Sequence, residues 1–151
     1  MTLSMNIRLV GVDQLEAKVK DPVRRRTMMW KAVERTLRAI ERQAKILAPH
    51  PPGKKGYSRG ALRSSITVDH PAGKMDGSVG PGLDYGPFVE FGTGKRGADS
   101  GVEPFGGYHY GENWPGMDAQ PYLVPGMKQA EPAIHEALDA LGLDIVRDLA
   151  S

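Results

Sequence analysis

The chain has 151 residues, of which 40% are hydrophobic, and its formal net charge is +2. A polypeptide of this length buries about two-thirds of its unfolded surface, so we expect one modest core and a single domain over residues 1–151. It has no cysteine, which excludes a disulfide framework and a thiolate metal site.

The sequence also argues against a membrane protein. Its longest apolar runs, such as Ile46-Leu47-Ala48, are far shorter than the ~20 residues that cross a bilayer. The first six residues have neither the basic nor the apolar region of a secretory signal. We therefore expect production in the cytoplasm and no membrane partner.

The small net charge hides a strong polarity along the chain. The first 74 residues carry a charge of +10 and the remaining residues carry −8. Two halves of opposite charge favour head-to-tail contacts between copies of a protein, provided that they stay apart in space. The alternative is that the two halves neutralise each other within one monomer.

The first elements are expected in the N-terminal third. Residues 6–10 alternate loosely and predict a short edge strand. Asp13 can cap a short helix from Gln14 to Lys18. From Pro22 to Ala48 one long amphipathic helix is predicted, because apolar residues recur every three or four positions. Prolines then end this helix, and residues 50–59 read as a Pro-, Gly- and Lys-rich loop.

The middle of the chain predicts a hairpin and a helical turn. Gly60 to Ile66 should open a strand that continues to Asp69, and residues 71–74 should turn the chain toward a second strand at 78–80. Tyr85, Phe88 and Val89 share one face of a single helical turn. Phe91 should pack inward, and Gly92 should release the chain.

Residues 93–119 are crowded with glycine and aromatic side chains. A loop of this length inside a small domain is usually functional or disordered. We expect an extended loop that docks on a neighbouring subunit, since exposed aromatic clusters tend to mark interfaces. The alternative is an irregular hairpin folded on its own domain.

A second amphipathic helix follows Pro121. Ile134, Leu138, Leu141, Ile145 and Leu149 fall at spacings of three and four. Pro132 should break or kink its beginning, and Gly142 should weaken its middle. The predicted fold class is α+β, with a small, largely antiparallel sheet packed against the long helix and the C-terminal helix alongside.

Four short segments in this order resemble a known family. They are Ala48-Pro49, Gly60-Ala61-Leu62-Arg63-Ser64-Ser65-Ile66, Tyr85-Gly86-Pro87-Phe88-Val89-Glu90-Phe91-Gly92-Thr93 and Gln120-Pro121-Tyr122-Leu123-Val124-Pro125-Gly126-Met127. The pattern resembles the head-tail joining, or tail-completion, proteins of the necks of long-tailed bacteriophages. This sequence departs from the family pattern at Gly86-Pro87, which replaces an alanine-rich pair, and in its longer loop over residues 95–119.

The resemblance implies a structural protein of the virion neck that is assembled in the bacterial cytoplasm and has no enzymatic activity. It implies a ring of subunits, with six as the expected number, that completes the tail and joins it to the DNA-filled head. The implied partners are further copies of the chain, the head-side connector protein and the tail tube protein. Leu62, Ile66, Tyr85, Phe88, Val89 and Phe91 are then core residues, and the interface residues are Phe105, Tyr108, Tyr110, Trp114, Glu90 and Arg63.

Catalytic and metal chemistry find little support in the sequence. Gly92 to Arg96 lacks both the first glycine and the hydroxyl residue of a phosphate-binding loop. The four histidines are scattered, which disfavours a zinc site, and Ser64 and Ser65 have no evident partners for nucleophilic catalysis. Glu90 can pair with Arg63 or serve as a catalytic acid, and the ion pair is favoured. We predict no catalytic residue, cofactor or metal.

Nucleic-acid binding is the main alternative function. A dense basic series on the long helix offers phosphate contacts, including a passing contact with genomic DNA. The candidate DNA-facing residues are Arg24, Arg25, Arg26, Arg35, Arg38 and Arg42. Because the basic residues occupy most of the polar perimeter of the helix, a solvated or subunit-facing surface is favoured over a DNA-binding strip.

Overall fold

The structure is a computed structural model that describes residues 3–8, 21–49, 60–93 and 115–150. In chain order its elements are β1 (Met5–Arg8), α2 (Pro22–Leu47), α3 (Ala61–Ser65), β2 (Ile66–Asp69), β3 (Asp76–Pro81), α4 (Gly86–Phe91) and α6 (Leu123–Ala150). The predicted α+β class is confirmed. The predicted helix at 14–18 and loop at 50–59 lie outside the described residues.

The three strands form an antiparallel sheet in the order β1-β3-β2. Met5 and Val68 both pair with Val79 from opposite sides of the central strand. The predicted hairpin is confirmed, and the edge strand expected over residues 6–10 is present as Met5–Arg8, with residues 9 and 10 outside the described part. The segment after Gly60 was expected to open directly as a strand, and this was wrong: Ala61–Ser65 first makes the short helix α3, and β2 begins only at Ile66.

Helix α2 follows from local sequence at both ends. The Asp21 side chain accepts hydrogen bonds from the backbone N–H groups of Val23 and Arg24 at 3.0 and 3.2 Å, which is the usual role of an N-cap aspartate. Pro22 sits in the first turn, where its missing N–H is tolerated. The helix ends at Leu47, one residue before the predicted end at Ala48, which is its C-cap.

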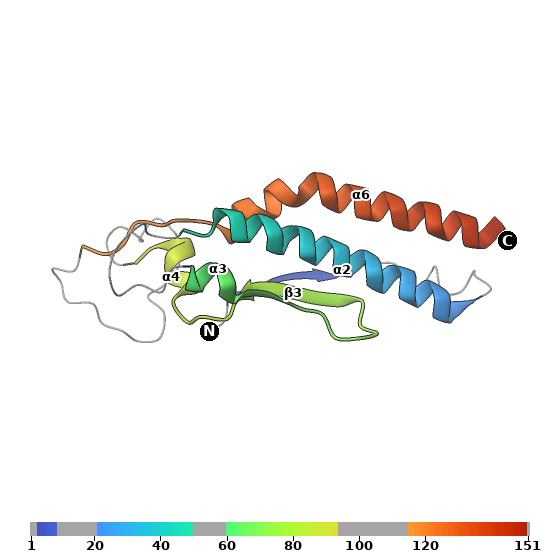
Figure 1. Cartoon of the computed structure of the whole chain (residues 1–151), viewed down its shortest axis with the longest axis horizontal. Coiled ribbons are helices and arrows are strands. Elements are labelled where there is room, and N and C mark those ends of the chain that lie inside the picture. Colours follow the sequence, from blue (N-terminus) through green and yellow to red (C-terminus); the bar gives the residue numbers. More distant parts are fainter. Residues whose placement is uncertain (1–2, 9–20, 50–59, 94–114, 151) are drawn as a thin grey trace.

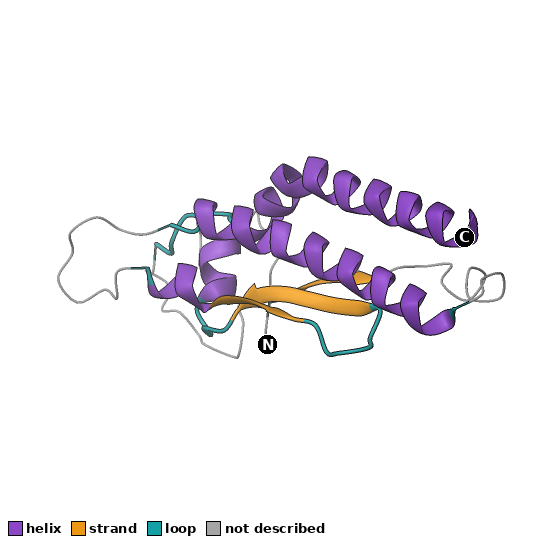
Figure 2. Cartoon of the chain, turned by 45° about the vertical axis from the view of Figure 1, so that its right-hand side comes forward, coloured by secondary structure: helices purple, strands orange, loops and turns teal. Residues whose placement is uncertain are grey.

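Helix α2 is the middle layer of the molecule. Figure 1 and Figure 2 show the sheet on one side of α2 and α6 on the other. The fully buried side chains on α2 include Val33, Leu37 and Ile40, and they meet Ile66 and Val79 of the sheet in one core. Helix α2 therefore contacts both outer layers and contributes a large share of the core side chains.

The core differs from the prediction at its aromatic residues: Phe88 and Phe91 are only half-buried, and Tyr85 is exposed. Leu62 and Ile66 are buried, and Val89 packs against the core, as expected. Tyr85 is 44% exposed, so its assignment to the core was wrong. The buried tyrosine is instead Tyr122, which is 0% exposed and lies directly before α6.

A polar cluster holds the β2–β3 turn against α2. The ring nitrogens of His70 lie 2.9 Å from Glu34 Oε2 and 3.0 Å from the Lys74 carbonyl oxygen. The Trp30 ring stacks on the His70 ring with centroids 4.8 Å apart, and its Nε1 donates to the Pro71 carbonyl at 3.2 Å. The hydrogen bond with His70 is the main reason that the pKa of Glu34 lies below its usual value.

Helix α6 runs antiparallel to α2 without interruption. Pro132 lies inside it, so the helix is not broken there. Figure 1 shows the first turns of α6 tilted relative to the rest, which agrees with the kink that was the other expected effect. The helix also continues through Gly142 to Ala150. At its far end Asp148 pairs with Arg24 at 3.3 Å and with the buried Arg25 at 3.8 Å. The opposite charges of the two chain halves are therefore partly neutralised within one monomer.

Two glycines of α6 test how closely it packs on α2. A Cβ at Gly126 would lie 2.8 Å from Ala44 N and 2.9 Å from Ala44 Cα, whereas a Cβ at Gly142 would meet no atom within 4 Å. We expect Gly126→Ala to destabilise the fold by about 1–3 kcal/mol through overpacking against the α2 backbone. Gly142→Ala should stabilise it by up to about 1 kcal/mol through helix propensity.

Thermal unfolding followed by circular dichroism compares the two variants with the parent chain. Both substitutions make the same chemical change in the same helix, so a lower Tm for Gly126→Ala and a higher Tm for Gly142→Ala isolate the packing effect. Equal shifts in both variants would contradict the close approach of α6 to α2.

Candidate functional site

The site is built on α4, a short helix that the sequence punctuates at both ends. Pro87 lies in its first turn, and Gly92 ends it with a φ of 75° that favours glycine. Gly86 is buried, and a Cβ at this position would overlap the ring of Pro81. The Gly86-Pro87 pair, which departs from the family pattern, thus fits the local packing.

Glu90 is the central residue of the site. It is 2% exposed, and its carboxylate accepts backbone hydrogen bonds from three consecutive residues of the α6 start. The donors are Tyr122 N at 2.7 Å, Leu123 N at 2.8 Å and Val124 N at 3.0 Å. A carboxylate at a helix N-terminus satisfies N–H groups that have no partner within the helix and meets the positive end of the helix dipole.

The first turn of α6 leaves no N–H group unaccounted for. Leu123 and Val124 donate to Glu90, Pro125 has no N–H, and Gly126 N donates to the Tyr122 carbonyl at 3.0 Å. The local sequence Gln120-Pro121-Tyr122 offers none of the residues that usually cap a helix. A glutamate 32 residues upstream of Tyr122 supplies the cap instead.

Tyr122 makes a second contact between α4 and the start of α6. Its hydroxyl donates to the Gly86 carbonyl at 3.4 Å across the buried contact between α4 and the start of α6. Burial, and to a lesser degree the negative charge of Glu90, raise the pKa of this phenol above its usual value. Tyr122 therefore stays protonated and available as a donor at any physiological pH.

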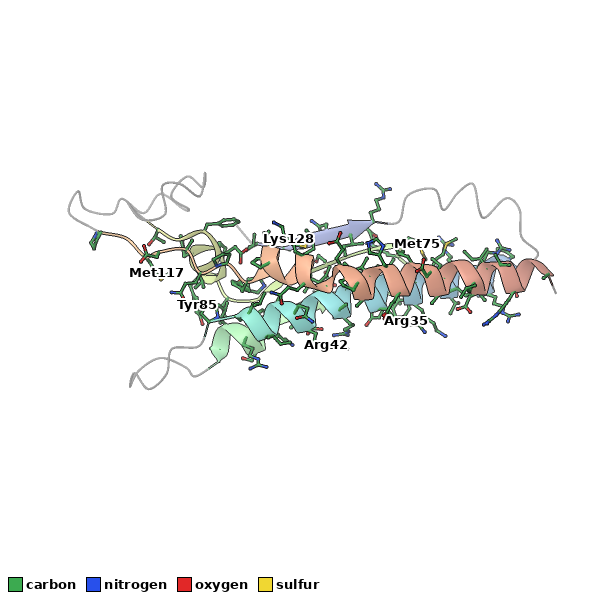
Figure 3. The ribbon with its side chains drawn as sticks, turned by 90° about the horizontal axis from the view of Figure 1, so that it is seen from above. Arg35, Arg42, Met75, Tyr85, Met117 and Lys128 are labelled. Atoms are coloured by element: carbon green, nitrogen blue, oxygen red, sulfur yellow. The ribbon has the colours of Figure 1, made fainter. Side chains whose placement is uncertain are left out.

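These contacts bring the two ends of the long glycine- and aromatic-rich segment together. Thr93 and Met117 exchange backbone hydrogen bonds of 2.9 and 3.1 Å, and Gln120 N donates to the Val89 carbonyl at 2.8 Å. Tyr85 and Met117 lie at the same end of the molecule in Figure 3. The described residues on either side of 94–114 are thus joined in one closed base, which we name the loop base (Thr93, Met117, Gln120 and Glu90).

The structure does not bring the predicted interface residues together in the part of the chain that it describes. Arg63 is exposed on α3 and makes no ion pair with the buried Glu90, so the favoured Glu90–Arg63 pair was wrong. The physical reason is that backbone amides at the α6 start occupy both carboxylate oxygens. Phe105, Tyr108, Tyr110 and Trp114 lie outside the described residues.

The predicted DNA-facing arginines do not form one uniform surface. Arg24, Arg26, Arg35 and Arg42 are exposed, and Arg35 and Arg42 lie along the edge of α2 away from β1 in Figure 3. Arg38 is also exposed, but it binds Glu34 at 2.9 Å and Glu41 at 3.0 Å. Arg25 is 0% exposed beside Asp148 and is not part of any exposed basic surface.

A search of family models identifies the kind of protein. Residues 12–92 match the family described as "Bacteriophage HK97-gp10, putative tail-component". The chain belongs to this HK97-gp10-like family. The matched range ends just after Glu90 and covers more than half of the chain. Comparisons with curated proteins and with solved structures gave no match.

Family membership makes this chain a tail-related structural component of a bacteriophage and places it in the virion. Within the described residues, no helix has both the length and the apolar composition needed to cross a membrane. The same part of the chain holds no group of three or more side chains suited to bind a metal ion.

The capping role of Glu90 predicts a loss of stability on removing its charge. Glu90→Gln keeps the shape of the side chain but replaces one acceptor oxygen with a donor that faces backbone donors. We expect the free energy of unfolding to fall by about 1–3 kcal/mol, because a backbone N–H group at the start of α6 loses its carboxylate acceptor. Chemical denaturation measures this change.

Glu131→Gln is the matched control, since Glu131 is an exposed glutamate on α6 itself. It should change the free energy of unfolding by no more than about 0.5 kcal/mol. Equal effects of the two substitutions would show that Glu90 does not hold the start of α6.

Proposed function

We propose that this protein forms a ring in the virion neck that completes the tail and joins it to the DNA-filled head. The observation that carries the proposal is the closed loop base on a protein of a phage tail family. A component that joins two larger assemblies needs a stable body and a segment that reaches a neighbour. The Glu90 contacts secure the part of the body next to the two ends of the long segment.

The long segment is the proposed contact with other subunits. It carries Phe105, Tyr108, Tyr110 and Trp114, and aromatic side chains supply large contact areas at low entropy cost. Its proposed partners are neighbouring copies of the chain, the tail tube protein and the head-side connector. Fixed ends lower the entropy cost of ordering such a segment on a partner.

The proposed role is structural and not enzymatic. Glu90 was the one candidate acid, and both of its oxygens accept backbone hydrogen bonds in a buried setting. A general acid must instead reach the reacting group of a substrate. This occupancy supports a neck protein that acts by binding. We also propose that it assembles in the host cytoplasm, as the family resemblance implies.

Trp114 tests the role of the segment in assembly. We expect Trp114→Ala to weaken ring formation by about 2 kcal/mol or more, as loss of an interface hot spot does. Trp114→Phe, which keeps most of the aromatic surface, should lose much less. Sedimentation velocity measures assembly, and negative-stain microscopy with and without tail tubes checks for rings. Unchanged assembly of Trp114→Ala would contradict the proposed contact.

A second candidate function is nucleic-acid binding through the exposed arginines of α2. The observation that favours it is that Arg35 and Arg42 lie on one edge of the helix. Such a surface could contact genomic DNA that passes through a neck ring.

Salt titration tests this second function. If Arg35 and Arg42 each neutralise a phosphate, Arg35→Gln/Arg42→Gln should lower the salt-dependence slope of DNA affinity by about 2, given roughly 0.9 per phosphate. Lys128→Gln is the control, because Lys128 is an exposed cation on α6. An unchanged slope in the arginine variant would exclude this edge as a DNA contact.

A further inference from the structure

The outer face of α6 carries an unusual mixture of charges and apolar side chains. Glu136, Asp139, Leu143 and Val146 follow one another at spacings of three, four and three, so they lie on one helix face. Leu143 is 59% exposed, Val146 is 62% exposed, and both acidic residues are exposed. We name these four residues the acidic stripe. It points away from the buried side of α6, which carries Ala137 and Ile145.

A complementary surface runs along α2. Met28, Lys31, Arg35, Arg42 and Ile46 fall at spacings of three, four, seven and four, which also places them on one helix face. Lys31, Arg35 and Arg42 are exposed, and Ile46 is 58% exposed. We name these five residues the basic stripe. Figure 3 shows two of its members, Arg35 and Arg42, on the same edge of α2.

The basic stripe borders a groove between α2 and α6. The groove has a volume of about 200 Å³. It is lined by Met28, Lys31, Ala32 and Arg35 of α2 and by Ala137, Leu141 and Asp144 of α6. Its lining is therefore mainly small or apolar, with cations on the α2 side and a single carboxylate on the α6 side.

The cations of the basic stripe are available to a partner. Lys31, Arg35 and Arg42 make no ion pair with another described residue, whereas the neighbouring Arg38 is held by Glu34 and Glu41. The acidic residues of the acidic stripe likewise form no ion pair in the described part of the chain. Each stripe thus combines exposed apolar side chains with unmatched charges, and the charges of the two stripes have opposite signs.

We propose that the acidic stripe of one subunit packs on the basic stripe and groove of a second copy of this chain. This inference rests on the proposed ring and names the surfaces that close it. The apolar side chains would bury against the groove while Glu136 and Asp139 meet Lys31 and Arg35, so one contact satisfies both kinds of exposed group.

The two stripes are different surfaces of one subunit, so their contact is head-to-tail. A head-to-tail contact repeats from subunit to subunit and makes a ring when its rotation closes. A two-fold dimer would instead use the same surface on both copies. The proposal therefore also explains how a chain with so uneven a charge distribution builds a closed assembly.

Two charge-reversed variants test the pairing. Lys31→Glu/Arg35→Glu reverses the basic stripe, and Glu136→Lys/Asp139→Lys reverses the acidic stripe. Each variant alone should stay monomeric at concentrations at which the parent chain assembles. An equimolar mixture should assemble again, because alternating subunits meet through one reversed pair and one original pair. Sedimentation velocity at fixed ionic strength measures all four samples, and circular dichroism verifies that each is folded.

The possible results separate the inference from the function on which it rests. Assembly of either variant alone, or a folded mixture that stays monomeric, would overturn the pairing of these stripes while leaving the ring intact. A parent chain that is monomeric at every concentration would overturn the ring itself and the pairing with it. A basic-stripe variant that loses DNA binding but still assembles would assign that stripe to DNA and also overturn the pairing.

Asp144 adds one control to this design. It lines the groove opposite Lys31 and Arg35, so new glutamates there could repel it within a single subunit. If Lys31→Glu/Arg35→Glu is unfolded, Lys31→Gln/Arg35→Gln removes the charges without adding repulsion. The neutral variant should assemble at least ten-fold more weakly than the parent chain, and equal assembly would overturn the pairing.

Discussion

The fold depends on one buried carboxylate. The carboxylate of Glu90 is buried from solvent, and three backbone N–H groups at the start of α6 donate hydrogen bonds to it in place of water. Neither partner is satisfied alone: the helix start has no capping residue of its own, and a buried charge without hydrogen bonds is costly. Their contact joins the α4 region to the longest helix of the domain, and it holds together the described residues that flank 94–114.

Helix α2 joins the other layers of the domain to each other. Because it lies between the sheet and α6, it is buried on two sides and leaves only a narrow solvent-facing strip for charged residues. Close packing with α6 near Gly126 and the polar cluster at His70 hold the outer layers to it. The exposed strip is rich in cations, whereas the outer face of α6 is rich in acids.

The regular elements could be predicted from the sequence because their signals are local. The apolar spacing of α2, its Asp21-Pro22 start and the prolines after Leu47 determine both ends of that helix. The hairpin follows from strand alternation around Pro71-Ala72-Gly73. The α3 turn was missed because Gly60 to Ser65 is too short to show a helical period.

The candidate site could be predicted only in outline, because its central contact joins residues far apart in the chain. The sequence singled out Glu90 but suggested Arg63 as its partner, since charge pairing is the simplest explanation for an acidic residue in an apolar motif. Backbone amides carry no sequence signature. The one available signal was an absence: Gln120-Pro121-Tyr122 precedes a strong helix without a usual cap. Tyr85 was assigned to the core and the buried Tyr122 was not, for a similar reason: nothing local distinguishes a buried tyrosine from an exposed one.

The closed loop base has a consequence for how such a protein can diversify. Closing a longer segment costs only about 0.6 kcal/mol for each doubling of its length, and the contacts that close it here lie entirely within the body of the domain. Insertions and substitutions between Thr93 and Met117 can therefore accumulate with little penalty to folding. Related phages could adapt this one segment to new neighbours while retaining the same scaffold.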